Sequence, residues 1–272
     1  MPTKEITLRI PESLRKVKNI IGVFSAKGGV GKSEISLSLA LSLKDSSYSV
    51  GLVDADIYGP SQPLLLKASS EEVQVKEKEL LLPLIKKGIK FISMGLIAKG
   101  AQPVIWRGPM VSGAVMQLLS MTDWQDLDYL IIDTPPGTGD IQLTLLQRIP
   151  LSASIVVTTP QKVSVSDTRK GIEMLKKLDL PILGLIENMS FFQPQGSDQK
   201  YFLFGKGGGK ELAKDYKLEL FSQIPLTEKS ESSILYEIDE YKVIFDDLSS
   251  KVVAQMNLIK KKINQIIPQQ KV

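Results

Sequence analysis

A glycine-rich segment near the N-terminus constrains the fold more than any other feature of this sequence. Residues Ser25 to Ser33 read S-A-K-G-G-V-G-K-S, and they lie between an apolar, β-branched run at Ile20 to Phe24 and a stretch with helical spacing that begins at Ile35. A strand, a glycine loop and a helix in this order form a cradle in which backbone N–H groups and a helix N-terminus face an anion. The segment therefore predicts a phosphate-binding loop at the edge of a sheet rather than a turn without a ligand.

Short apolar runs alternate with helical patterns along the rest of the chain. Continuous apolar runs of this kind are typical of parallel strands buried on both faces. The further runs are Val50 to Val53, Ile89 to Met94, Tyr129 to Ile132, Ser154 to Thr158 and Ile182 to Ile186. We therefore expect an α/β fold with a doubly wound, mostly parallel sheet flanked by helices, formed by residues 1–272 as a single domain.

The glycine loop is predicted to bind ATP and Mg²⁺. Lys32 reaches the β and γ phosphates, and the Ser33 hydroxyl binds Mg²⁺. Ala26 stands where the ordinary pattern has its first glycine, so the motif is the variant K-G-G-x-G-K-S. Glu34 adds a carboxylate that repels a triphosphate, and we expect it to weaken nucleotide affinity. The predicted nucleotide contacts in the loop are Ala26, Lys27, Gly28, Gly29, Val30, Gly31, Lys32 and Ser33.

Carboxylates at the ends of two strands are the candidates for chemistry, because the chain has no histidine to act as a base. Asp56 follows the run at Val50 to Val53 and is predicted to orient the attacking water, with Asp54 supporting the site. Asp133 ends the run at Tyr129 to Ile132 before a Pro-Gly turn, and it is predicted to hold the water shell of Mg²⁺. Lys27, Lys32 and Asp56 are thus the candidate catalytic residues.

The extra lysine of the loop, Lys27, makes the sequence similar to the SIMIBI class of P-loop ATPases with a deviant phosphate loop. The resemblance implies a homodimer in which Lys27 reaches the partner's nucleotide and supplies charge in the transition state. ATP binding and dimerisation are then coupled.

Four longer motifs make the chain resemble the Mrp (ApbC) family of ATP-dependent iron–sulfur cluster carriers. These are V-G-L-V-D-A-D-I-Y-G-P-S from Val50, W-R-G-P-M from Trp106, L-D-Y-L-I-I-D-T-P-P-G-T-G-D-I-Q-L-T from Leu127, and E-N-M-S from Glu187. The resemblance implies slow ATP hydrolysis, adenine recognition by Asn188, and iron–sulfur apoproteins or scaffold proteins as partners. We also expect the extra N-terminal domain of some relatives to be absent.

The cluster site of that family is missing from this sequence. Family members follow E-N-M-S with a C-x-x-C pair that bridges a [4Fe–4S] cluster in the dimer, whereas residues Phe191 to Gly196 read F-F-Q-P-Q-G. The chain has no cysteine at all, and glutamine and glycine are not ligands for such a cluster. No iron–sulfur ligand is predicted here, so the carrier function implied by the resemblance conflicts with the composition.

Two other functions remain open. The first is an ATP-dependent dimerisation switch of the MinD or ParA type. Its ATP-bound dimer would bind a membrane, DNA or a protein partner and serve there in positioning or as a scaffold. An amphipathic C-terminal helix at Tyr241 to Ile267 would serve a membrane, but such a helix more often packs on its own domain. The second is a ligase or small-molecule kinase, for which no second substrate motif is present.

The remaining sequence features indicate no further binding function. The charge of +4, from 34 basic and 30 acidic residues, is too small to indicate nucleic-acid binding. No apolar run approaches the roughly 20 residues of a membrane span, and the N-terminus lacks a secretory signal, so we expect a cytoplasmic protein. The run F-G-K-G-G-G-K from Phe204 is predicted to be the entry turn of a helix, not a second phosphate loop.

Overall fold

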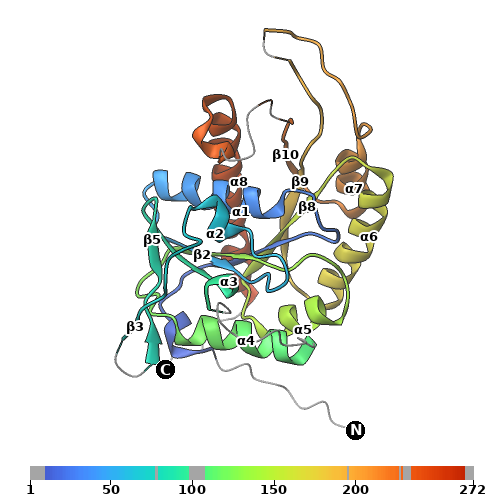
Figure 1. The fold of residues 1–272 in the computed structure, drawn as a ribbon. Coiled ribbons are helices and arrows are strands. Elements are labelled where there is room, and N and C mark those ends of the chain that lie inside the picture. The colour runs from blue at the N-terminus through green and yellow to red at the C-terminus, as the bar shows by residue number, and fades with distance from the viewer. Residues whose placement is uncertain are drawn as a thin grey trace.

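An eight-stranded sheet forms the centre of the computed structural model, which describes residues 10–76, 79–97, 108–194, 196–226, 228 and 234–266. The strand order is β10-β9-β8-β1-β7-β2-β6-β5, and only the edge pair β5 and β6 is antiparallel (Figure 1). The strands are β1 Ile20–Phe24, β2 Val50–Asp54, β5 Leu84–Lys86, β6 Ile89–Ser93, β7 Tyr129–Asp133, β8 Ala153–Thr158, β9 Ile182–Glu187 and β10 Leu220–Gln223. The expected mostly parallel sheet is confirmed.

Helices cover both faces of this sheet because each central strand is apolar on both sides. Every residue of β1, β2, β7 and β8 is buried. Ile21 and Val23 of β1 pack in one apolar cluster, whereas Ile20 and Phe24 point the other way into two further clusters. Because successive side chains of a strand point to opposite faces, one continuous apolar run contributes to the hydrophobic contacts with the helices on both faces of the sheet.

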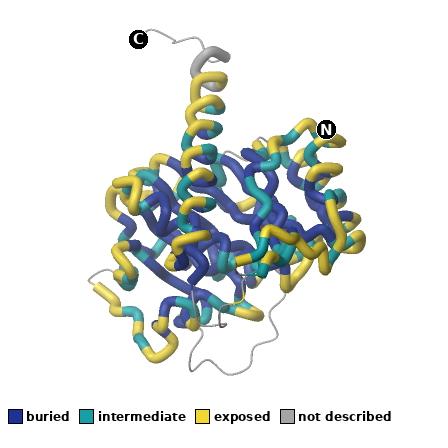
Figure 2. Tube along the Cα trace, turned by 90° about the horizontal axis from the view of Figure 1, so that it is seen from above, coloured by how far each residue is buried: buried dark blue, intermediate teal, exposed yellow. Residues whose placement is uncertain are grey.

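The first layer consists of α1 (Lys32–Asp45) and α8 (Asp239–Ile266), and the second of α4 (Gly108–Met121), α5 (Asp140–Arg148), α6 (Lys162–Lys177) and α7 (Gly208–Tyr216). The short elements are η1 (Glu12–Leu14), α2 (Gln62–Leu65), α3 (Met94–Ile97) and η3 (Leu235–Glu237), with β3 (Val75–Lys76) and β4 (Leu80–Leu81) forming a separate small hairpin. Figure 2 shows the buried strands inside the molecule and more exposed positions on the outer helices.

Several sequence predictions can be compared with these bounds. Met94 was expected in a strand but begins α3. α7 begins at Gly208 after Gly207, whose φ of 82° is left-handed, so the expected helix-entry turn is confirmed.

The C-terminal helix packs on the sheet as expected. Val252 and Met256 of its apolar stripe are buried in the cluster shared with α1. The side chains of Ile263 and Ile266, and all of Ile267, lie outside the described residues. Within the part of the chain that the structure describes, no helix is long and apolar enough to cross a membrane.

Candidate active site

The glycine loop connects β1 with α1 and takes a shape that its glycines require. Gly29 has φ 76° and Gly31, at the N-cap of α1, has φ 82°, both in the left-handed region that favours glycine. A Cβ at Gly31 would also lie 2.2 Å from the Nδ2 atom of Asn188. The loop conformation therefore explains the spacing of glycines read from the sequence.

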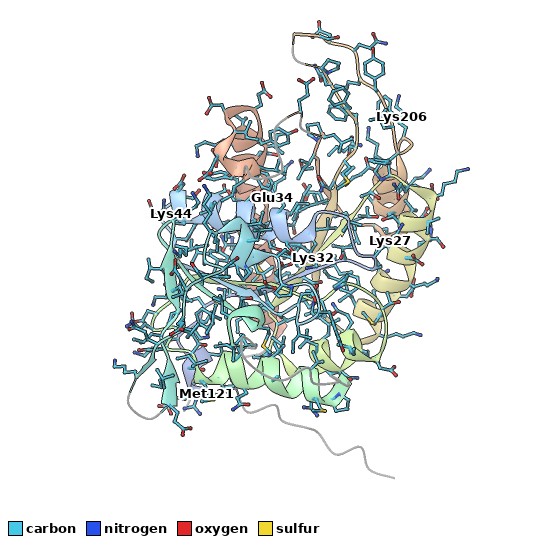
Figure 3. All side chains as sticks on the ribbon, in the orientation of Figure 1. Lys27, Lys32, Glu34, Lys44, Met121 and Lys206 are labelled. Atoms are coloured by element: carbon cyan, nitrogen blue, oxygen red, sulfur yellow. The ribbon has the colours of Figure 1, made fainter. Side chains whose placement is uncertain are left out.

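A cavity of about 340 Å³ opens over this loop. It is lined by residues from Gly28 to Glu34, by Asp56 and Ser61 after β2, and by Pro136 after β7. Because parallel strands present their carboxyl ends at one edge, three segments far apart in the sequence meet here. Lys27, Lys32 and Glu34 lie around the loop in Figure 3. The structure thus brings the phosphate loop together with Asp56.

Lys32 and Asp133 form a buried ion pair beneath this cavity. Lys32 is 6% exposed and Asp133 is fully buried, and the Lys32 Nζ donates to Asp133 Oδ1. The Ser36 hydroxyl donates to the same oxygen over 3.2 Å, and Gln62 Nε2 donates to Oδ2 over 2.9 Å. Asp133 is therefore held by three donors.

A second buried carboxylate lies beside Asp133. The register of β2 and β7 pairs Asp54 with Asp133. Burial, and next the charge of Asp133, raise the pKa of Asp54 to about 7. Asp54 accepts from the Asp56 N–H over 3.2 Å and from the Ser93 hydroxyl over 3.1 Å, so it holds the segment after β2. Its predicted support of the catalytic site stays a prediction.

Asp56 is nearly buried and is held by its own turn. Its Oδ1 accepts the backbone N–H groups of Tyr58 over 3.1 Å and Gly59 over 3.2 Å. The turn fixes the side chain at the rim of the phosphate cavity. Its role in orienting water stays a prediction.

Ala26 and Lys27 differ in their surroundings. Ala26 is half-buried and packs against the apolar cluster that contains Phe24, so its methyl group occupies space beside the helix α6 at Gly171. This packing explains how alanine is accommodated where the ordinary pattern has glycine. Lys27 is exposed, and its carbonyl accepts from the Ser25 hydroxyl over 3.0 Å.

Asn188 braces the phosphate loop. Its Nδ2 donates to the Val30 carbonyl over 2.9 Å, and its backbone N–H donates to Thr158 over 2.8 Å. The side chain is buried, and its contact with an adenine ring stays a prediction.

Glu34 has a partner that the sequence did not reveal. Its Oε1 accepts the backbone N–H of Leu235 over 2.6 Å and the Ser38 hydroxyl over 3.4 Å. Burial raises the pKa of Glu34. The carboxylate lines the phosphate cavity and also holds η3, so its expected effect on nucleotide affinity stays untested.

Sequence reasoning also missed Gln62 and Ser36, which both donate to Asp133. Ser36 lies four residues after Lys32, on the same face of α1, and this spacing was a usable signal. Gln62 follows Asp56 in the G-P-S-Q-P segment, where a polar residue before proline gave no clear hint. The Trp106 and Arg107 of the W-R-G-P-M motif lie outside the described residues.

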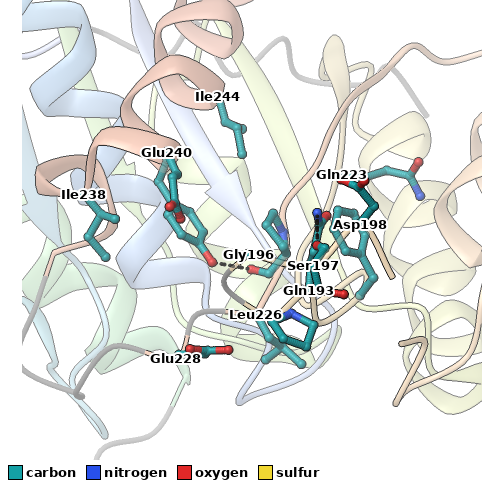
Figure 4. Close-up of a pocket in the computed structure, with 14 residues that line it drawn as sticks. Gln193, Gly196, Ser197, Asp198, Gln223, Leu226, Glu228, Ile238, Glu240 and Ile244 are labelled. Atoms are coloured by element: carbon teal, nitrogen blue, oxygen red, sulfur yellow. Dashed lines mark hydrogen bonds between the residues drawn. The ribbon is translucent and has the colours of Figure 1, made fainter. Parts of the chain in front are cut away.

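The segment after E-N-M-S, where the resemblance to the Mrp family implies a cysteine pair, forms an extension between β9 and α7, which projects from the body of the molecule in Figure 1. Phe192 and Tyr201 pair as an antiparallel bridge at its base. A cavity of about 670 Å³ lies between this segment and the start of α8 (Figure 4). Phe191, Asp198 and Tyr241 line it, and the chain offers no thiolate there. Among the described residues, no group of three or more acids, histidines or cysteines is arranged to hold a metal ion.

Comparisons with known proteins agree with this architecture. The chain is similar to an iron–sulfur cluster carrier protein from Synechocystis, with 47% identity over 219 residues, which is 79% of this chain and 62% of that protein. It is 40% identical over 256 residues to the iron–sulfur cluster transfer protein NUBPL of Dictyostelium discoideum, covering 91% of this chain and 79% of that one. The chain thus spans less than two thirds of the Synechocystis relative.

A solved structure is also similar. The nucleotide-binding protein from Archaeoglobus fulgidus, in complex with ADP, matches with a TM-score of 0.71 and 32% identity over 88% of this chain and 90% of that one. The family model of the ParA-type NUBPL iron-transfer P-loop NTPases matches residues 16–264. These matches, together with the phosphate loop and its buried Lys32–Asp133 pair, show that the chain belongs to the NUBPL iron-transfer family of P-loop NTPases.

Proposed function

We propose that this chain is a slow, cytoplasmic, Mg²⁺-dependent ATPase that acts as a homodimer in iron–sulfur cluster assembly without binding a cluster through its own side chains. The observation that carries the proposal is the arrangement of Lys32, Ser33 and Asp133 at one phosphate cradle. A lysine, a hydroxyl and a strand-end carboxylate are the groups that P-loop enzymes use for a nucleoside triphosphate and its metal ion.

The chain's own residues have distinct tasks in this proposal. Lys32 would contact the β and γ phosphates, the Ser33 hydroxyl would hold Mg²⁺, and Asp133 would accept hydrogen bonds from the waters on that ion. When bound there, Mg²⁺ would neutralise the negative charge that develops on the phosphate oxygens. Asp56 orients the attacking water, and Lys27 of each protomer reaches the other protomer's nucleotide across the dimer. Exposure of Lys27 supports this last role.

In this proposal the iron–sulfur cluster is cargo rather than a resident group. The side chains of this chain do not provide a set of ligands for it. Thiolates hold such clusters, and the chain has none. A cluster would therefore stay on the thiols of an apoprotein or scaffold partner, while the ATPase cycle changes how that partner is held. In the other form of the same proposal, the protein has kept the ATP-dependent conformational switch but no longer handles a cluster.

Anaerobic reconstitution tests the proposal directly. The purified chain is incubated with iron and sulfide, and its iron content and visible spectrum are recorded beside phosphate release from ATP. We expect ATP hydrolysis without a bound cluster, and we expect Lys27→Ala to lose hydrolysis while it still binds nucleotide. A cluster bound in the absence of added thiols would contradict the ligand argument, and no hydrolysis by the wild-type chain would contradict the ATPase.

A second candidate is a nucleotide-controlled scaffold of the MinD or ParA type. An exposed apolar and basic surface favours this function. It consists of the exposed side chains of Tyr201, Phe202 and Leu203, with Lys200 over the ring of Phe191 and Lys206 over the ring of Phe202. Co-sedimentation with anionic lipid vesicles, with and without ATP, tests it. ATP-dependent sedimentation that Leu203→Ser abolishes would favour the scaffold, and no sedimentation would argue against a membrane.

A further inference from the structure

Gln62 forms hydrogen bonds with Ser33, Asp54 and Asp133, which come from three different segments of the site. Its side-chain Nε2 donates to the Ser33 carbonyl over 2.8 Å and to Asp133 Oδ2 over 2.9 Å. Its backbone N–H donates to Asp54 Oδ2 over 3.2 Å. Gln62 is fully buried at the start of α2, so these contacts are shielded from water.

The other end of the same amide lacks a partner. Gln62 Oε1 is buried and accepts no hydrogen bond from any described residue. The orientation of the amide is fixed by its neighbours, because both contacts of Nε2 are with oxygen acceptors and only the NH₂ group can donate to them. A buried carbonyl oxygen without a donor is unusual in a folded protein and indicates a missing partner such as water.

Covalent geometry limits where this oxygen lies. The C=O and C–N bonds of an amide place its O and N atoms about 2.3 Å apart. Since Nε2 is 2.9 Å from Asp133 Oδ2, the free Oε1 lies within roughly 5 Å of that carboxylate oxygen. The free Oε1 therefore lies beside the carboxylate that is assigned to the water shell of Mg²⁺.

We propose that Gln62 is a positioning residue for magnesium, in which Nε2 fixes Asp133 and the Ser33 backbone while Oε1 accepts a hydrogen bond from a water on the ion. Mg²⁺ keeps several of its waters in protein sites, and each of these waters needs an acceptor. This role rests on the proposed nucleotide site and adds a residue that the phosphate-loop and strand-end motifs do not contain. It also links the metal to the segment that carries Asp56, because α2 directly follows that segment.

The chemistry of an amide suits this place better than that of an acid or an apolar group. A carboxylate at residue 62 would face the oxygen atoms of Asp133 and Ser33 without a proton to share. That repulsion is relieved by a bound cation, so Gln62→Glu is expected to increase the affinity for a divalent ion. Gln62→Met keeps the length of the side chain but removes both polar atoms, so it is expected to decrease that affinity.

The affinity of the site for a divalent ion is measured by Mn²⁺ binding to the ADP complex, without relying on ATP turnover. Free Mn²⁺ is quantified by its electron paramagnetic resonance signal. The affinity for ADP without metal is measured with a fluorescent ADP analogue in EDTA. Gln62→Met should weaken Mn²⁺ binding by about 10–100-fold, the range typical for outer partners of metal ligands, with metal-free ADP affinity unchanged within about twofold. Gln62→Glu should bind Mn²⁺ more tightly than the wild type.

Gln142 provides the matched control. It is also a buried glutamine with an unpartnered Oε1, but its Nε2 donates to the Thr134 hydroxyl over 3.0 Å and not to a carboxylate. Gln142→Met should leave Mn²⁺ affinity unchanged. Equal losses in the two methionine variants would mean that any lost buried amide weakens the site, and they would overturn the role of Gln62.

The remaining outcomes are also decisive. Wild-type Mn²⁺ affinity in Gln62→Met, or equal losses of metal and metal-free ADP affinity, overturns the inference. If circular dichroism shows that Gln62→Met is unfolded, Gln62→Glu decides, and unchanged or weaker Mn²⁺ binding in it overturns the inference. Failure of the wild-type chain to bind ADP at all would instead reject the proposed function.

Discussion

Replacement of Lys32 by methionine is expected to destabilise the nucleotide-free protein strongly. Lys32 is the counterion of Asp133 in a fully buried place, and Asp54 lies beside Asp133 on the next strand. Removing one partner of a buried ion pair leaves an uncompensated charge and destabilises proteins by about 3–5 kcal/mol. For a chain of this size, each kcal/mol lowers the melting temperature by about 2–4 °C, so a decrease of roughly 6–20 °C follows.

The assay is thermal and urea unfolding of the protein without nucleotide. Lys44→Met is the control, because Lys44 lies on the same helix and its ion pair with Asp45 is exposed on both sides, which predicts a change within about 0.5 kcal/mol. The double variant Lys32→Met with Asp133→Asn removes both charges and should recover much of the loss. A Lys32→Met protein that melts at the wild-type temperature would refute the reasoning, since the pair would then be of no consequence for the empty site.

Three further substitutions test other contacts. Burial raises the pKa of Glu34, so the folded protein binds a proton at this carboxylate more readily than the unfolded chain does. As pH falls through the raised pKa toward the usual value, the wild type should gain stability relative to Glu34→Gln, as measured by urea unfolding across pH. An equal pH dependence of the two proteins would contradict this. Gly31→Ala places a Cβ 2.2 Å from Asn188 Nδ2 at a φ of 82°, and it should lose nucleotide affinity and about 1–3 kcal/mol of stability, measured by calorimetry and unfolding; wild-type binding would show that the loop adapts. Gly171→Val drives a side chain toward the Phe24 ring, because a Cβ added at residue 171 would lie 2.5 Å from a ring carbon. The variant should lower stability by about 1–3 kcal/mol without changing metal-free ADP affinity, and an unaltered melting temperature would contradict the close packing of α6 on β1.

The sheet could be predicted from the sequence because its central strands are continuous apolar runs. The predicted ends of β2, β7 and β9 each fall one residue short, since the acid that ends each strand is polar but still paired in the sheet. β5 and β10 were missed because runs of three and four residues carry too little periodic signal.

Local motifs also predicted Lys32, Ser33 and Asp133, but not the contacts between distant segments. The Glu34–Leu235 and Asn188–Val30 hydrogen bonds join residues 201 and 158 positions apart. No pattern along the chain encodes such pairs, because they form only when the fold brings their elements together. Gln62 belongs to the same group, since its partners lie on β7 and in the phosphate loop.

The helix α1 has a mechanical consequence beyond its role in phosphate binding. Its first turn holds the Leu235 N–H through Glu34, and its last turn accepts the Tyr236 hydroxyl at Asp45 over 3.0 Å. Between these points, Ser42 donates to the Phe245 carbonyl of α8 over 3.0 Å. The helix α1 is thus hydrogen-bonded to the C-terminal part of the chain near both of its ends and at Ser42, so a displacement of α8 would act on the same helix whose first turn lines the phosphate cavity.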